Sequence, residues 1–121
     1  MSFDENKVVQ QSGETGETDT AVDLAEMGSH AAEAAGFLKA LSHEGRLMIL
    51  FHLVAGEKTV TELERLLSSR QAAVSQQLTR LRLEGLVQAR REGKSIHYSI
   101  ADARVLSMAR LVHSLFCTPQ G

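Results

Sequence analysis

The stretch from Ser68 to Leu86, SSRQAAVSQQLTRLRLEGL, decides the fold of this chain of 121 residues. Val74, Leu78 and Leu81 recur at the spacing of one helical face, which predicts an amphipathic helix. The side chains left outside are amides, hydroxyls and arginines without a carboxylate, and they suit a surface that approaches a polyanion. Polar faces are also normal for surface helices, so the neighbouring segments must decide. The predicted core residues are Ala73, Val74, Leu78 and Leu81, and the outward ones are Arg70, Gln71, Ser75, Gln76, Gln77, Thr79, Arg80 and Arg82.

The charge of this chain is distributed unevenly along its length. The net charge of −2 by itself argues against a nucleic-acid binder. Residues 1–38, however, contain eight acidic residues and one basic residue (−7), whereas residues 65–94 contain seven basic and two acidic residues (+5). Such an asymmetry governs the steering of a polyanion, and the total conceals it.

Length and composition set the class of protein. A chain of 121 residues suits one domain, and a core without tryptophan, built from Leu, Val, Ala, Ile and Met, favours helices. The single cysteine, Cys117, excludes a disulfide framework within the chain. The sequence shows neither a membrane span nor a signal pattern, so we expect a cytoplasmic protein. Residues 1–20 are predicted to form a disordered acidic tail and residues 21–118 the folded domain.

Two helices are expected before the opening stretch, and a third leads into it. Small residues line the first, from Ala21 to Leu41, and the sequence leaves open whether it packs on its own core or on a second subunit. The next is predicted to begin at a Ser42 cap and to end at Gly56. A short third helix is predicted to start with a capping box and to end at a pair of serines, which are also predicted to cap the helix of the opening stretch. Two helices joined by so tight a turn make a helix-turn-helix. The box residues are Thr61 and Glu64, and the serines are Ser68 and Ser69.

The pattern changes from helix to strand after Gly85. Residues 86–91 and 95–100 are predicted to form a hairpin joined by Glu92-Gly93-Lys94, with Arg90 and Arg91 near its tip. A basic tip alone is equally consistent with a solvated hairpin end, but beside a basic helix it indicates a winged helix that binds DNA.

The last predicted helix, capped by Asp102, carries a wide apolar stripe. In a domain this small, part of such a stripe is expected to pack on a second subunit. A dimer would present two helices to a palindromic operator with half-sites about 34 Å apart.

The segments LKALSHEGRLMIL, VSQQLTRLRLEGLV and RREGKSIHYSI resemble the ArsR/SmtB family of bacterial winged-helix repressors over about residues 31–117. The resemblance is closest to the reactive-sulfur-responsive and NolR-like subgroup. It implies a mainly α-helical protomer of about five helices with a two-stranded wing, which dimerises through its first and last helices. It also implies release of operator DNA when an inducer is sensed.

The metal sites of that family do not match this sequence. The family's Cys-x-Cys site falls on residues 59–63, which contain neither cysteine nor histidine. In the last helix Asp102 is kept, but Arg104 stands where the family has histidine, and Phe116 stands three residues after His113. We therefore expect no metal site and no cofactor. The histidines His30, His43, His52, His97 and His113 are scattered without paired ligand spacing.

Cys117 raises a separate question. In the two-thiol members of the subgroup, one cysteine follows the MIL segment and the other ends a His-Ser-Leu-aromatic-Cys segment. Here the second is kept as residues 113–117, but Phe51 replaces the first, so a bridge within one protomer is excluded. Three alternatives stay open: a quiet residue, a one-thiol sensor of reactive sulfur or oxidants assisted by His113, and ligation of haem or metal across a dimer.

The sequence thus predicts a homodimeric repressor that binds double-stranded DNA. The alternatives are a constitutive NolR-like repressor without an inducer and a winged helix that binds a protein partner. An enzyme is not expected, because no nucleophile with a base and no phosphate loop is present. The predicted base contacts are Arg70, Gln71, Ser75, Gln76 and Thr79, and the predicted phosphate contacts are Arg80, Arg90, Arg91 and Lys94.

Overall fold

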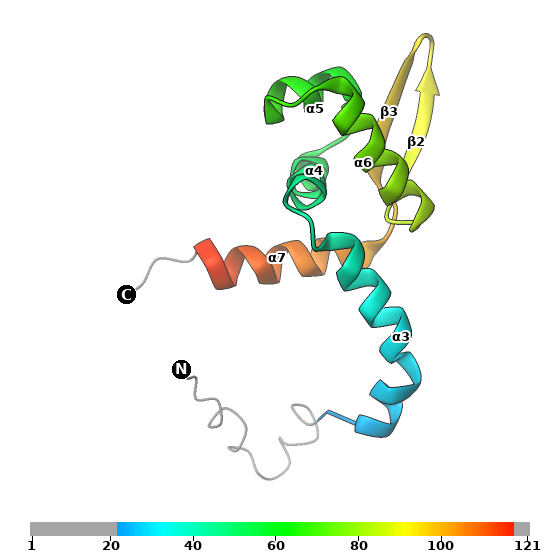
Figure 1. Cartoon of the computed structure of the whole chain (residues 1–121), viewed down its shortest axis with the longest axis vertical. Coiled ribbons are helices and arrows are strands. Elements are labelled where there is room, and N and C mark those ends of the chain that lie inside the picture. Colours follow the sequence, from blue (N-terminus) through cyan, green and yellow to red (C-terminus); the bar gives the residue numbers. More distant parts are fainter. Residues whose placement is uncertain (1–21, 118–121) are drawn as a thin grey trace. The chain divides into compact units, whose positions relative to one another are not determined.

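The computed structural model describes residues 22–117, and the predicted tail at residues 1–20 lies outside them. The chain divides after Ala35 into two units, and the unit from Gly36 onward contains the predicted helix-turn-helix and hairpin. The described residues form α3 (Leu24–Leu41), α4 (Glu44–Ala55), β1 (Lys58–Thr59), α5 (Val60–Leu67), α6 (Gln71–Leu83), β2 (Val87–Glu92), β3 (Ser95–Ile100) and α7 (Ala103–Cys117). In Figure 1 the β2–β3 hairpin stands beside α6, and its tip projects away from α7.

The sheet contains one strand more than predicted. β2 and β3 form the expected antiparallel hairpin, in which Val87 pairs with Ile100 and Glu92 with Ser95. The short strand β1 adds to the other edge of β3 and gives the order β1-β3-β2. A strand of two residues has no detectable alternation, so the sequence offered no signal for it. Residues 22–117 contain five helices, as predicted, and the winged helix-turn-helix is confirmed.

The core joins every helix of the larger unit. Leu50 of α4, Leu63 of α5, Leu78 and Leu81 of α6 and Val105 of α7 are all at most 1% exposed. Burial of a large aliphatic side chain contributes about 1.5–3 kcal/mol, so these contacts hold α6 at a defined place on the domain. Ala73, which we predicted in the core, is exposed, because the apolar face of α6 is narrower at its first turn.

Three predicted helix caps are wrong by one or two residues. His43, not Ser42, begins α4, and its Nδ1 accepts hydrogen bonds from the N–H groups of Gly45 and Arg46. The Ser42 hydroxyl instead donates to the carbonyl of Lys39 at the end of α3.

The capping box of α5 and the start of α6 are displaced as well. The box uses Thr59 and Glu62 rather than Thr61 and Glu64, because the chain turns directly from β1 into the helix. Ser68 ends α5 in the left-handed conformation, and α6 follows an extended Arg70 without a side-chain cap.

Arg46 ties three helices together. Its Nε donates to the carbonyl of Ala40 at 2.6 Å, and its Nη1 donates to Oε1 of Gln77 at 3.2 Å. Gln77, which we placed on the outward face of α6, is therefore half-buried and occupied by a contact within the protein. This network fixes the middle of α6 against the junction of α3 and α4.

Candidate DNA interface

The predicted reading residues lie on α6 and at its start. Gln76 and Thr79 are exposed, and Ser75 is half-buried. The Thr79 hydroxyl donates to the carbonyl of Ser75 at 2.9 Å, which leaves its oxygen able to accept. Gln71 is the first residue of α6, and its side chain lies outside what the structure describes.

The arginines of α6 are not equivalent. Arg80 pairs with Glu84 one turn later, at 3.2 Å between Nε and Oε2. Arg70 and Arg82 are exposed and form no ion pair with any described residue. An exposed ion pair such as Arg80–Glu84 contributes little to stability, so Arg80 can exchange the Glu84 carboxylate for a phosphate.

The two arginines of the hairpin lie on opposite faces of the sheet. Side chains alternate along a strand, so Arg91 shares the face of Val87, which is buried against the helices. Arg91 pairs across the hairpin with Ile96, a residue beside the reading helix. Arg90 pairs with His97 and lies on the other face.

Arg90 is held by two carboxylates on that outer face. Its Nη2 lies 2.7 Å from Oε1 of Glu57, and its Nη1 lies 3.0 Å from Oε1 of Glu92. The hydrogen bond from Arg90 holds the pKa of the Glu57 carboxyl below its usual value, and the two carboxylates raise the pKa of Arg90. His97 lies 4.0 Å from Glu57 and 3.7 Å from Glu92. Contact of Arg90 with DNA stays a prediction. Because two carboxylates already bind Arg90, Arg91 is the better candidate for a phosphate contact.

Helix and hairpin meet around one hollow of about 460 Å³, which we call the wing hollow. Ser75 of α6 and Lys94 of the hairpin tip, both predicted to contact DNA, line it together. The sequence did not predict its other polar members as part of the interface, because only the tertiary structure brings the start of α5 to the hairpin. These are Thr59, Thr61, Ser95 and Tyr98.

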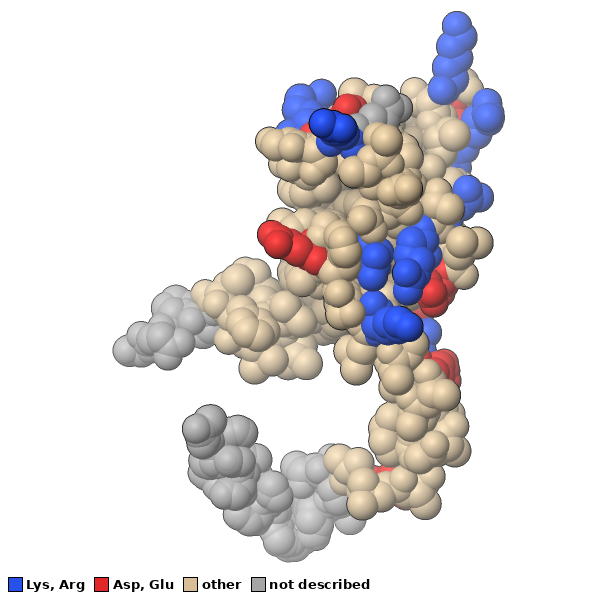
Figure 2. Space-filling model, in the orientation of Figure 1, with Lys and Arg blue, Asp and Glu red and all other residues tan. Residues whose placement is uncertain are grey.

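Positive charge is concentrated around these elements. Figure 2 shows Lys and Arg side chains from the region of α6 to the tip of the hairpin, with few acidic side chains among them. The two acids within residues 65–94, Glu84 and Glu92, are both paired with arginines. Among the described residues, Arg70, Arg82, Arg91 and Lys94 form no ion pair with a carboxylate. A surface with this charge attracts a polyanion.

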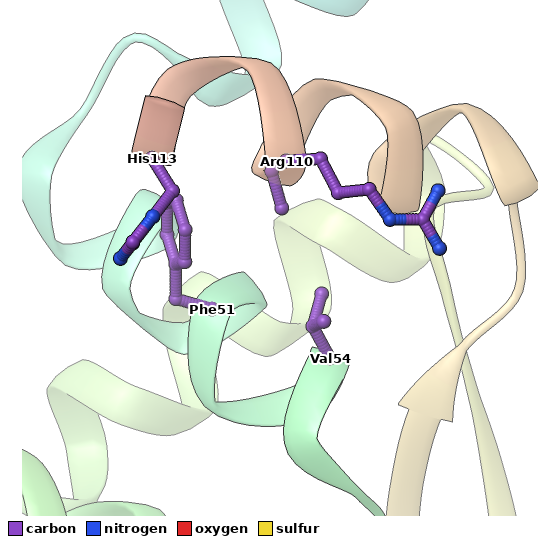
Figure 3. A pocket seen from close by; sticks show the side chains of 5 residues that line it. Phe51, Val54, Arg110 and His113 are labelled. Carbon is purple, nitrogen blue, oxygen red and sulfur yellow. The ribbon is translucent and has the colours of Figure 1, made fainter. Parts of the chain in front are cut away.

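The predicted sensing residues lie elsewhere, on α7. Phe51 and Val54 of α4 line a groove of about 330 Å³ together with Ala109, Arg110 and His113 of α7. Figure 3 shows the rings of Phe51 and His113 close to each other in this groove. Phe51, which replaces the first cysteine of the two-thiol regulators, thus lies in the same groove as His113. Cys117 is the exposed last residue of α7. Within residues 22–117, no three His, Cys, Asp or Glu side chains are grouped to hold a metal ion.

The sequence and fold match those of known transcription regulators. The chain is 40% identical over 99 residues to a biofilm growth-associated repressor of Agrobacterium fabrum, covering 82% of this chain and 85% of that protein. It is 40% identical over 96 residues to the transcriptional activator HlyU of Vibrio cholerae, covering 79% and 89%. It is also 37% identical over 83 residues to the nodulation protein NolR of Rhizobium meliloti, covering 69% and 68%.

Solved structures of transcription regulators share the fold of this chain. The repressor BigR of Xylella fastidiosa is 38% identical and superposes with a TM-score of 0.77, over 81% of this chain and all of that one. A homodimeric winged helix-turn-helix domain of a possible ArsR-family regulator from Mycobacterium bovis is 29% identical with a TM-score of 0.65, over 86% and 88%.

These features define a DNA-binding winged helix-turn-helix regulator rather than an enzyme. The family model described as "Bacterial regulatory protein, arsR family" matches residues 43–89, from the cap of α4 into β2. The chain belongs to the arsR family, as its motifs predicted. No described helix has the length and apolar character needed to span a membrane.

Proposed function

We propose that this protein is a homodimeric, sequence-specific repressor that binds a palindromic DNA operator. The proposal depends on one juxtaposition: Ser75 of the reading helix and Lys94 of the hairpin tip line the same hollow. With α6 in a major groove, the hairpin then meets the neighbouring backbone. The base contacts are assigned to Arg70, Gln71, Ser75, Gln76 and Thr79, and the phosphate contacts to Arg80, Arg91 and Lys94. The sequence also predicts a phosphate contact for Arg90, but Glu57 and Glu92 already balance its charge, so its share is assigned as the smaller one.

Exposed apolar side chains support the dimer. Leu111, Leu115 and Phe116 of α7 are 58%, 65% and 80% exposed, and Leu38 near the end of α3 is 61% exposed. Packing against a second subunit would bury these apolar side chains, and each Å² of apolar area removed from water stabilises the dimer by about 25 cal/mol. The Mycobacterium bovis relative is homodimeric, which supports the same arrangement for this chain.

The test is selection of duplexes from a randomised pool, followed by sedimentation of the free and bound protein. We expect a palindromic motif with half-sites about 34 Å apart, bound by one dimer. Leu115→Asp is expected to give monomers and to weaken operator binding more than tenfold, whereas Leu66→Asp on α5 is the matched control. Selection of no motif, or tight binding by monomers, contradicts the proposal.

Heparin separates DNA binding from the alternative of a protein-binding winged helix. The DNA-binding proposal predicts retention on heparin and elution at moderate salt, because the unpaired arginines of α6 and the hairpin would bind its sulfates. A protein that passes through heparin unretained and selects no duplex would instead be a protein-interaction module.

Regulation through Cys117 is a second candidate function. It is favoured by the exposure of the thiol at the end of α7, the helix assigned to the dimer interface. Oxidation or persulfide formation there would add bulk or charge beside Phe116. Operator binding by the wild type and by Cys117→Ser is measured reduced and after polysulfide or peroxide treatment. Weakening confined to the treated wild type supports a sensor, and no weakening supports a constitutive NolR-like repressor.

A further inference from the structure

The wing hollow is built from three parts of the chain that are far apart in sequence. Thr61 comes from the first turn of α5, Ser75 from α6, and Lys94 and Ser95 from the hairpin. Each contributes a hydroxyl or an ammonium group, and none of the described residues that line the hollow is acidic. A site with donors and positive charge but without an acid suits an anion.

Two hydroxyls of this hollow are not used by any other described residue. Thr59, which also lines it, uses its hydroxyl in the capping box with Glu62. The side-chain hydroxyls of Thr61 and Ser95, in contrast, form no hydrogen bond with any described residue, and Lys94 forms no ion pair with one. Donors that converge on a hollow without protein partners are available to a ligand.

The position of the hollow indicates which anion it takes. It lies between the reading helix, where Gln76 is exposed, and the hairpin tip. In a winged-helix complex a backbone strand of the duplex borders the groove that the helix reads. A water molecule occupies about 30 Å³, so a hollow of about 460 Å³ has room for a hydrated sugar-phosphate unit.

We propose that the wing hollow seats one phosphate of the DNA backbone and that Thr61 and Ser95 are further DNA-contacting residues, acting with Lys94. This inference rests on the proposed DNA-binding function and deepens it. The hydroxyls contribute hydrogen bonds without charge, so they fix the register of the duplex and read no base.

Methylphosphonate scanning of a duplex selected by the wild type tests the site directly. Each substitution removes the charge of one backbone position. We expect one position per half-site where it weakens wild-type binding about tenfold, because charge-assisted hydrogen bonds are lost there. The Thr61→Ala/Ser95→Ala protein is expected to bind the unmodified duplex about tenfold more weakly than the wild type does. Methylphosphonate at the sensitive position is then expected to weaken binding by the double variant by less than a further factor of about two. If the double substitution and the methylphosphonate weaken binding independently at every backbone position, so that their factors multiply, the proposal is overturned.

The salt dependence gives a second readout. The double variant is expected to keep the wild-type slope of log K against log salt, because it removes no cation, whereas Lys94→Ala lowers the slope by about one. Thr61→Ser, which keeps the hydroxyl, is expected to bind like the wild type, and Ser99→Ala on β3 is the matched control outside the hollow. Equal losses in Thr61→Ser and Thr61→Ala would assign Thr61 a structural role and overturn the proposal.

Inorganic phosphate at constant ionic strength distinguishes a free anion from the DNA backbone. If the hollow serves a free phosphate, millimolar phosphate shifts the amide resonances of Thr61 and Ser95, and the double variant binds DNA normally. That result overturns the proposal. Failure of the wild type to select any duplex would instead refute the proposed function itself, so the two failures are distinguishable.

Discussion

The carboxylate of Glu57 lies 2.7 Å from the guanidinium of Arg90 and holds it on the sheet face away from the reading helix. Arg91, the next residue, lies on the opposite face and is free of carboxylates among the described residues. Two adjacent arginines that look alike in the sequence therefore face different surroundings. The first prediction uses this difference.

Arg91→Ala should lower the slope of log K against log salt by about one, because one phosphate contact and its released counterion are lost. Arg90→Ala should change the slope much less, since its charge is already balanced by Glu57 and Glu92. Both slopes are measured by fluorescence anisotropy with a selected duplex at salt concentrations from about 50 to about 200 mM. Equal slopes for the two variants would contradict the assignment of the hairpin faces.

Gln76→Ala should change which sequences are bound. Gln76 is exposed on α6, and a bidentate amide contact to a base contributes about 1–3 kcal/mol of discrimination. Gln77→Ala is the matched control, because its side chain accepts from Arg46 and should affect stability rather than preference. Selection from a randomised pool with each variant shows whether the preferred motif changes, and a changed motif for Gln77→Ala alone would refute the assignment.

Leu78→Ala should lower the free energy of unfolding by about 2–5 kcal/mol, because Leu78 is 1% exposed at the centre of the core. Leu83→Ala, on the same helix but 81% exposed, should change it by no more than about 0.5 kcal/mol. Urea denaturation followed by circular dichroism compares them. Similar losses for both would show that the buried face of α6 is misassigned.

Acid should destabilise the domain partly through Glu62. Its carboxylate accepts from the N–H of Thr59 at 2.8 Å, which lowers the pKa of Glu62 from 4.5 in the folded state. The stabilisation is therefore fully present above the unfolded pKa of about 4.5 and is lost as the pH falls through the lower, folded pKa. The pKa values of Glu57 and Asp102 are also lowered, so they contribute in the same direction.

Glu62→Gln should make the unfolding midpoint less sensitive to pH as the pH falls below the unfolded pKa of 4.5, since one titrating carboxylate is removed. Thr59→Ala removes the other half of the box and should cost about 1 kcal/mol. Thermal unfolding across this pH range measures both. An unchanged pH dependence in Glu62→Gln would mean that this box does not contribute in solution.

Local order along the chain was sufficient to predict the helix-turn-helix, the hairpin and the helical α7. Val74, Leu78 and Leu81 mark one face of α6 because helical periodicity links residues three and four apart, and Gly93 marks the hairpin tip because its φ of 63° suits glycine. Such signals come from neighbouring residues, so they survive without tertiary information.

Contacts between distant segments were decided only by the folded structure. Arg90 meets Glu57 across 33 positions, and Arg46 meets Gln77 across 31. These pairings decide which side chains are already bonded within the protein and which remain available to contact DNA. Thr61 and Ser95 join the candidate interface for the same reason, since packing of α5 against the hairpin, rather than any local pattern, brings their hydroxyls to one hollow.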